Sequence, residues 1–331
     1  MDFAHFGLAR RPFRPTPDTD AYCATAAHEA AGSVLARTYA DGGGVVVLDG
    51  EPGTGKTLVV LRFLESLPAA TCRILLQATK CSRPADFFQA ILFDLGQPYQ
   101  GMSEQELRLA VYSEMLNALA QDQAVVLFID EAQNLTGEVL EEIRVLGNLE
   151  SKESKALLVI LVGQSALREL LNKPESASFA QRVAARARLS PLVHEESIRY
   201  VRHQLRECGG RPEWLITDEA LTLLANHTGG IPRVLNRVSL LAFALAEAAG
   251  VKEVDAEPVI DALIQLELMP SQPDEHPPLG PKPPRPKLSE DFEPEEANIL
   301  PHPGPPPARP TPRQSAKKTQ PRKPQGKRNV S

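Results

Sequence analysis

The stretch from Val45 to Leu61 constrains the fold of this chain more than any other. It reads VVVLDGEPGTGKTLVVL: a β-branched apolar run stops at Gly50, and a helix-compatible pattern begins at Lys56. A glycine-rich loop between a strand and a helix presents successive backbone N–H groups to an anion, and the helix N-terminus favours negative charge. The stretch therefore predicts a phosphate-binding loop.

The residues of this loop have separate predicted roles. Its glycines lack a Cβ atom, so the backbone can curl round phosphate oxygens. Lys56 is expected to reach the β- and γ-phosphates of ATP, and Thr57 is expected to ligate Mg²⁺. The predicted nucleotide contacts run from the end of the strand into the first turn of the helix: Gly50, Glu51, Pro52, Gly53, Thr54, Gly55, Lys56, Thr57 and Leu58.

A second apolar run ends in two acidic residues. Residues 125–131 read VVLFIDE, which is too hydrophobic for a half-exposed strand and is typical of a central strand in a parallel sheet. At the carboxyl end of such a strand, Asp130 can hold Mg²⁺, and Glu131 can orient and deprotonate the attacking water. The alternative is a helix start whose acids favour the helix dipole. The phosphate loop upstream favours the metal site.

A third apolar run, residues 157–162, predicts another buried strand, which delivers Gly163 and Gln164 to the same sheet edge. The Gln164 side chain can there reach the γ-phosphate, or it can simply cap the next helix, and the spacing leaves both readings open. Strands and helices alternate through residues 45–170. This alternation predicts a three-layer α/β/α domain with a parallel sheet and ligands at the strand carboxyl ends.

Three arginines follow in the run FAQRVAARARL, residues 179–189. Arg182 and Arg186 stand four residues apart, and we expect them to share one face of a helix. Either can serve as an arginine finger, a cation inserted into the nucleotide site of a neighbouring subunit to stabilise developing phosphate charge. The alternative is a solvated basic face.

The remaining chain divides by composition. Residues 1–20 hold three prolines and three phenylalanines, which predicts an extended segment pinned by aromatic anchors. Residues 194–266 have a helical pattern with short loops, which predicts a small bundle. Within it, Arg233 stands at a helix start, where a cation gains nothing from the dipole, so a phosphate partner is predicted. We predict domains at residues 1–190 and 191–268 and a tail at 269–331.

The predicted tail differs from the rest in proline content and charge. Residues 271–331 hold 17 prolines, which predicts disorder with polyproline II character. The chain carries a net charge of −6, and residues 1–270 alone carry −10, which does not suit a general binder of nucleic acid or anionic membranes. Residues 309–331, with eight basic residues and no acid, leave DNA or another anionic partner open for the tail.

The cysteines and the apolar runs indicate in which cellular compartment the protein resides. The four cysteines are scattered, without a C-x-x-C pair, and therefore indicate reduced thiols. The N-terminus lacks the uninterrupted apolar region of a signal peptide, and no apolar run reaches the roughly 18 residues of a membrane-spanning helix. We expect a cytoplasmic protein without a transmembrane segment.

Seven segments, in their order, carry a family resemblance. They are HFGLARRPFRPTPD (5–18), GEPGTGKT (50–57), IDEAQNL (129–135), IRVLGNLE (143–150), VGQSAL (162–167), QRVAAR (181–186) and GGIPRVLNR (229–237). Together they cover about residues 1–266 and resemble the AAA+ ATPases of the general secretion pathway protein A (ExeA-like) type. The resemblance extends more distantly to transposition ATPases of the TniB kind.

This resemblance implies an AAA+ core with a helical lid, with Gln164 as sensor 1 and Arg233 as sensor 2, and it supports Arg182 and Arg186 as finger candidates. It implies a Mg²⁺-dependent ATPase that forms a ring or filament of identical subunits and rearranges a protein client in secretion, pilus or exopolysaccharide assembly. Two alternatives stay open. One is an ATP-gated DNA-binding protein of transposition or replication type, and the other is a scaffold whose proline-rich tail recruits partners.

Overall fold

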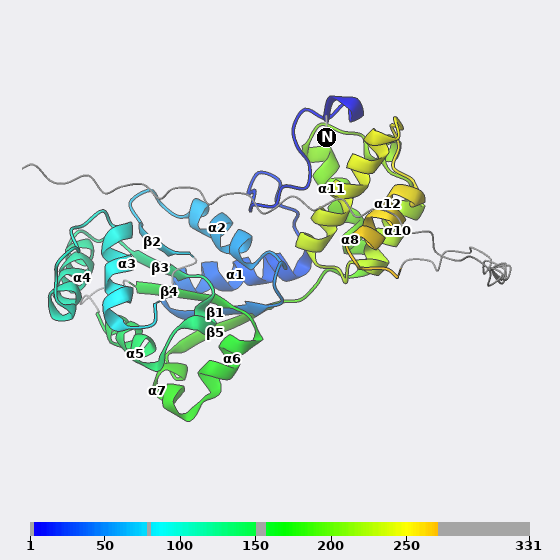
Figure 1. Ribbon diagram of the computed structural model, residues 1–331. Coiled ribbons are helices and arrows are strands. Elements are labelled where there is room, and N and C mark those ends of the chain that lie inside the picture. Colours follow the sequence, from blue (N-terminus) through cyan, green and yellow to red (C-terminus); the bar gives the residue numbers. More distant parts are fainter. Residues whose placement is uncertain (1–2, 78–80, 150–156, 271–331) are drawn as a thin grey trace, which may run out of the picture. The chain divides into compact units, whose positions relative to one another are not determined.

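The computed structural model describes residues 3–77, 81–149 and 157–270 (Figure 1). The chain divides into two units, residues 1–273 and 274–331, and the first holds the elements below. The predicted tail therefore lies, from residue 271 on, outside the described residues. The predicted domain boundaries at residues 190 and 268 stay predictions.

A parallel sheet of five strands is formed between residues 44 and 189 of this unit. In space the strands lie in the order β2-β3-β4-β1-β5, and each neighbouring pair is parallel. Every carboxyl end therefore meets the same sheet edge, as predicted. The strands are β1 (Gly44–Gly50), β2 (Cys72–Leu76), β3 (Val125–Ile129), β4 (Leu157–Gly163) and β5 (Val183–Leu189).

Helices cover both faces of the sheet, which confirms the three-layer α/β/α prediction (Figure 1). Alternate residues of β1 belong to the two faces: Val46 packs with α1 and α2, whereas Val47 packs with the helices of the other face. The first face carries α1 (Ala26–Ala40) and α2 (Lys56–Ser66). The second carries α3 (Pro84–Asp94), α4 (Glu104–Ala120), α5 (Gly137–Leu146), α6 (Ser165–Asn172) and α7 (Ala177–Ala180).

A helical bundle with its own apolar core follows β5, as the pattern of residues 194–266 predicts. The N-terminal segment joins this core, because the buried rings of Phe6 and Phe13 pack against Phe243. The aromatic anchors are thus confirmed, although Phe3–Phe6 forms a short 3-10 helix, η1, in a segment predicted to be extended. The bundle comprises α8 (His194–Glu207), α9 (Pro212–Leu215), α10 (Asp218–His227), α11 (Pro232–Ala248) and α12 (Ala256–Gln265).

No helix among the described residues combines the length and the apolar character needed to cross a bilayer.

The helix predicted over residues 179–189 is wrong. The helix α7 ends at Ala180, and residues 183–189 form β5, an edge strand paired with β1. Ala185 and Ala187 pack toward α1 and α2, whereas Arg186 is exposed, which is the two-residue alternation of a half-buried strand. The four-residue spacing of the arginines is compatible with a helix, but the small side chains of Ala185 and Ala187 allow the strand to pack closely beneath α1. Arg182 and Arg186 therefore share no helix face.

Candidate nucleotide-binding site

The loop between β1 and α2 has the backbone conformation that its glycines permit. Gly53 and Gly55 have φ of 84° and 95°, in the left-handed region that other residues rarely adopt. A Cβ atom at Gly53 would lie 2.7 Å from the Cβ of Arg233, and one at Gly55 would lie 2.8 Å from Nε2 of His28. These two glycines are thus required both for the turn and for the close approach of other elements.

Lys56, the first residue of α2, points its ammonium back into the loop. Its Nζ donates hydrogen bonds to the backbone carbonyls of Gly50, at 3.0 Å, and Glu51, at 2.8 Å. Burial lowers the pKa of Lys56, while the nearby carboxylates of Glu131 and Asp130 oppose that change. The loop therefore holds a cation at its centre, where phosphate oxygens can replace the carbonyl partners.

Thr57 and Asp130 meet as a hydroxyl and a carboxylate from different elements. Oγ1 of Thr57, in the first turn of α2, donates a hydrogen bond of 2.7 Å to Oδ2 of Asp130, at the end of β3. Mg²⁺ prefers such oxygen ligands and usually completes its shell with phosphates and waters. The described residues hold no cluster of three or more histidine, cysteine or acidic residues that could bind a metal. The pair therefore fits a Mg²⁺ ion that binds together with phosphates, which would supply the remaining ligands. It does not form a complete metal site by itself.

Glu131 is held in a strained and well-defined position. Its φ of 52° is unusual for a residue other than glycine, and such strain concentrates at functional sites. Its Oε2 accepts hydrogen bonds from Nε2 of Gln133, at 2.5 Å, and from Nε2 of Gln164, at 3.2 Å. The carboxylate is thus fixed by two amide donors from two strand ends.

Gln164 follows β4 directly, as predicted. Its side chain makes no capping hydrogen bond with α6, so the capping alternative does not describe this structure. Its backbone N–H instead donates to Oε1 of Gln133 at 3.2 Å. Gln133 therefore bridges the segments after β3 and β4. Gln133 has no role among the sequence predictions, although it lies inside the IDEAQNL motif. Its position two residues after Glu131 is the signal that could have indicated one.

Arg233 reaches the loop from the helical bundle. It is the second residue of α11, and its backbone N–H donates a hydrogen bond of 3.2 Å to the carbonyl of Gly53. Its positive charge is among the causes that lower the pKa of Lys56. A pocket gathers Arg233 with the loop, Asp130 and Glu131. The two cations thus face one pocket, which suits a polyanionic ligand.

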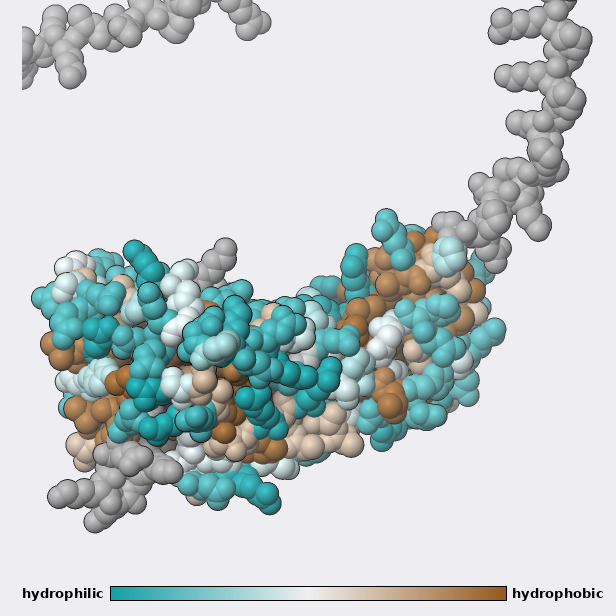
Figure 2. Space-filling model, turned by 90° about the horizontal axis from the view of Figure 1, so that it is seen from below, coloured by the Kyte–Doolittle hydropathy of each residue, from teal (hydrophilic) through white to brown (hydrophobic). Residues whose placement is uncertain are grey.

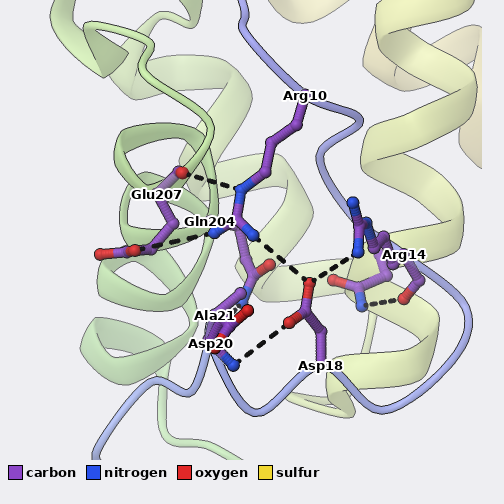
Figure 3. A network of polar contacts seen from close by, with 8 residues as sticks. Arg10, Arg14, Asp18, Asp20, Ala21, Gln204 and Glu207 are labelled. Carbon is purple, nitrogen blue, oxygen red and sulfur yellow. Dashed lines mark hydrogen bonds and ion pairs between the residues drawn. The ribbon is translucent and has the colours of Figure 1, made fainter.

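The N-terminal segment forms another wall of this pocket, through residues 14–18. Figure 3 shows the polar contacts that hold this segment in place. Asp18 forms ion pairs with both Arg10, at 3.8 Å, and Arg14, at 3.3 Å. The segment is tied to α8, because Nε2 of Gln204 donates a 2.8 Å hydrogen bond to the carbonyl of Ala21. A proline-rich stretch distant in sequence is therefore placed beside the phosphate loop.

His28 of α1 supports the loop from behind, and the sequence analysis missed it. Its Nδ1 lies 2.6 Å from Oγ1 of Thr25, and its Nε2 lies 3.0 Å from the carbonyl of Thr54. Because a carbonyl can only accept, Nε2 carries the proton. Burial is the main cause that lowers the pKa of His28 below its ordinary 6.5, so the ring is neutral near pH 7. No local sequence signal links residue 28 to residue 54.

The two predicted finger arginines do not join the site of their own chain. Arg182 precedes Val183, which pairs with Val45 near the start of β1, whereas the phosphate loop follows the opposite end of that strand. Five residue steps along β1 separate the two ends by about 17 Å. This is farther than an arginine side chain extends. Arg186 lies exposed in the middle of β5.

These features define the class: the chain has the AAA+ fold of the P-loop NTPases, with a phosphate loop after β1 and an acidic pair after β3. Residues 38–171 match the family model described as an AAA domain.

The chain is 37% identical over 247 residues to general secretion pathway protein A of Aeromonas hydrophila, a match that covers 74% of this chain and 45% of that protein. The resemblance indicated by the motifs is therefore confirmed. The chain spans about half the length of this curated relative.

Two solved structures share the fold. The Cdc6p structure from Pyrobaculum aerophilum has a TM-score of 0.61 at 20% identity, covering 80% of this chain and 71% of that one. The ORC2 protein of Aeropyrum pernix, in ADPNP–ADP complexes, has a TM-score of 0.58 at 16% identity, covering 74% of this chain and 68% of that one. At these identities the likeness concerns the fold alone.

Proposed function

We propose that this chain is a Mg²⁺-dependent ATPase that uses ATP binding and hydrolysis to rearrange an oligomer of itself or a protein partner. One observation carries the proposal: the hydroxyl of Thr57 and the carboxylate of Asp130 lie 2.7 Å apart beside the buried Lys56. A hydroxyl, a carboxylate and an ammonium at a helix N-terminus are the groups that a nucleotide triphosphate with its metal requires.

In this mechanism the chain positions reactants and stabilises charge. The loop N–H groups and Lys56 bind the phosphate oxygens. Thr57 and Asp130 would hold Mg²⁺, which would neutralise phosphate charge. Glu131 orients the attacking water and takes its proton. Gln164 and Arg233 act as sensors that report the nucleotide state to α6 and to the helical bundle.

The first test is hydrolysis by the full chain. We expect phosphate release from ATP in the presence of Mg²⁺, and loss of that release when EDTA removes the metal, because Asp130 and Thr57 then have no cation to join to the phosphates. Phosphate release can be followed with a coupled dye assay. Turnover that persists unchanged in EDTA would contradict the metal assignment, and tight ATP binding without any turnover would make the chain a nucleotide-gated binder instead.

Gln133 is expected to act as a positioning residue for Glu131. Gln133→Ala removes the 2.5 Å hydrogen bond to the carboxylate and the bond from the Gln164 backbone, so kcat should fall about tenfold while ATP affinity stays unchanged. The control is Asn134→Ala, its exposed neighbour in the same short 3-10 helix. Equal kcat values for the two variants would show that Gln133 only packs between the strands.

We also propose a place for this activity. Similarity to a protein named for the general secretion pathway supports work at the cytoplasmic side of secretion, pilus or exopolysaccharide assembly, as a ring or filament of identical subunits. The ATP-gated DNA-binding alternative has less support, because residues 1–270 carry a net charge of −10. DNA affinity that requires ATP and falls steeply with salt would favour that alternative.

A further inference from the structure

The helix α11 is apolar on two sides. One stripe is buried in the bundle core, including Leu235, Val238 and Phe243. A second stripe, formed by Arg237, Leu240, Leu241 and Ala244, follows the i, i+3, i+4, i+7 spacing of one helix face. Leu240, Leu241 and Ala244 are half-buried, and the two leucines border the bundle core. A bundle helix usually turns polar residues to its outer side, so part of this apolar stripe is left uncovered.

This second stripe lines a groove of about 550 Å³, which we call the α11 groove. Its other walls are Phe3 and Arg11 of the N-terminal segment and Leu266, just after α12. Figure 2 shows hydrophobic residues gathered on the helical bundle, at the right of the view. The groove lies apart from the nucleotide pocket, with which it shares no lining residue.

Two exposed arginines give the α11 groove its charge. Arg11 and Arg237 are both exposed, and within the described part of the chain neither has an ion pair or a hydrogen bond. No acidic residue among those described lines the groove. An apolar groove with free guanidinium groups and no carboxylate is complementary to an apolar stripe that is flanked by acids.

The walls of the groove also indicate the shape of its ligand. The backbone groups of α11 and α12 are bonded within their own helices, so the groove offers no strand edge to which an extended peptide could add. The stripe from Arg237 to Ala244 spans two helical turns, about 10 Å. A second helix laid along α11 can interdigitate its side chains with a stripe of this length.

We infer that the α11 groove is a docking site for an acidic amphipathic helix of a partner protein, which places its apolar face on Leu240, Leu241 and Phe3 and its carboxylates on Arg11 and Arg237. The site is independent of the nucleotide chemistry proposed above.

The test uses two fluorescent peptides of about 18 residues. One has leucines at i, i+3, i+4 and i+7 flanked by glutamates, and the other has the same composition in an order that breaks the stripe. By fluorescence anisotropy with the full chain, the first peptide should bind with a Kd of roughly 10 μM, and at least about tenfold more tightly than the second. Equal binding of the two peptides would overturn the proposal.

Variants then locate the contact. Leu241→Glu should weaken binding at least about tenfold. Arg237→Glu should weaken binding of the acidic peptide and strengthen binding of a version with lysines in place of glutamates, which a merely misfolded variant cannot do. Arg37→Glu, which changes an exposed arginine of α1, is the matched control and should bind like the unchanged chain.

Other occupants would give distinct results, each of which overturns the proposal. Binding to anionic vesicles that Leu241→Glu abolishes, without binding of either peptide, would assign the groove to a membrane surface. Concentration-dependent self-association that the same variant abolishes, again without peptide binding, would assign it to a second copy of this chain. Peptide binding that is unaffected by Leu241→Glu and Arg237→Glu would place the contact elsewhere.

Discussion

Glu131→Gln is expected to leave ATP binding intact and to slow hydrolysis by about 10²–10⁴-fold, the usual contribution of a positioned general base. Glutamine has the shape of glutamate and can still accept a hydrogen bond from Gln133 or Gln164, so the site should keep its structure. What it loses is the ability to take a proton from water. Single-turnover hydrolysis and nucleotide affinity, measured on the same preparation, separate the two effects.

Lys56→Ala is the comparison that makes this result interpretable. It removes the buried ammonium at the centre of the loop, so it should abolish ATP binding and, with it, turnover. The two variants therefore lose activity at different steps. Near-normal turnover in Glu131→Gln would show that another carboxylate activates the water, and Asp130 would be the first residue to examine.

The sequence predicts those parts of the site in which one short segment contains both a strand and the functional side chains that follow it. The apolar runs before Gly50, Asp130 and Gln164 favour buried strands, and parallel strands bring their carboxyl ends to one edge. The contact between Thr57 and Asp130 follows from that geometry, although 73 residues separate them.

The missed features depend on contacts that no local pattern encodes. His28 matters because a Cβ-free Gly55 lets its ring reach the carbonyl of Thr54. The edge strand β5 differs from the predicted helix because the four-residue spacing of two arginines does not specify a helix, and Ala185 and Ala187 pack closely beneath α1 in a strand. In both cases tertiary packing decides the outcome.

The position of β5 favours Arg182 over Arg186 as the arginine finger. Since Arg182 lies at the far end of β1 from its own phosphate loop, any action on ATP must be on a neighbouring subunit. Arg182→Ala should therefore cut turnover by about 10³–10⁵-fold and leave nucleotide affinity nearly unchanged. Arg186→Ala should have a smaller effect, because Arg186 lies on the exposed face in the middle of β5, and it serves as the matched comparison.

Mixing the variants tests the intersubunit contact directly. In a mixed oligomer, a Lys56→Ala chain can supply Arg182 to the intact phosphate loop of an Arg182→Ala chain, so part of the activity should return although each variant alone is inactive. Mass measurement of the mixed oligomer is the necessary control. If mixed oligomers form and no activity returns, Arg182 does not act between subunits. If Arg186→Ala lowers turnover more than Arg182→Ala does, and only its mixture with Lys56→Ala regains activity, the arginine finger is Arg186 in β5.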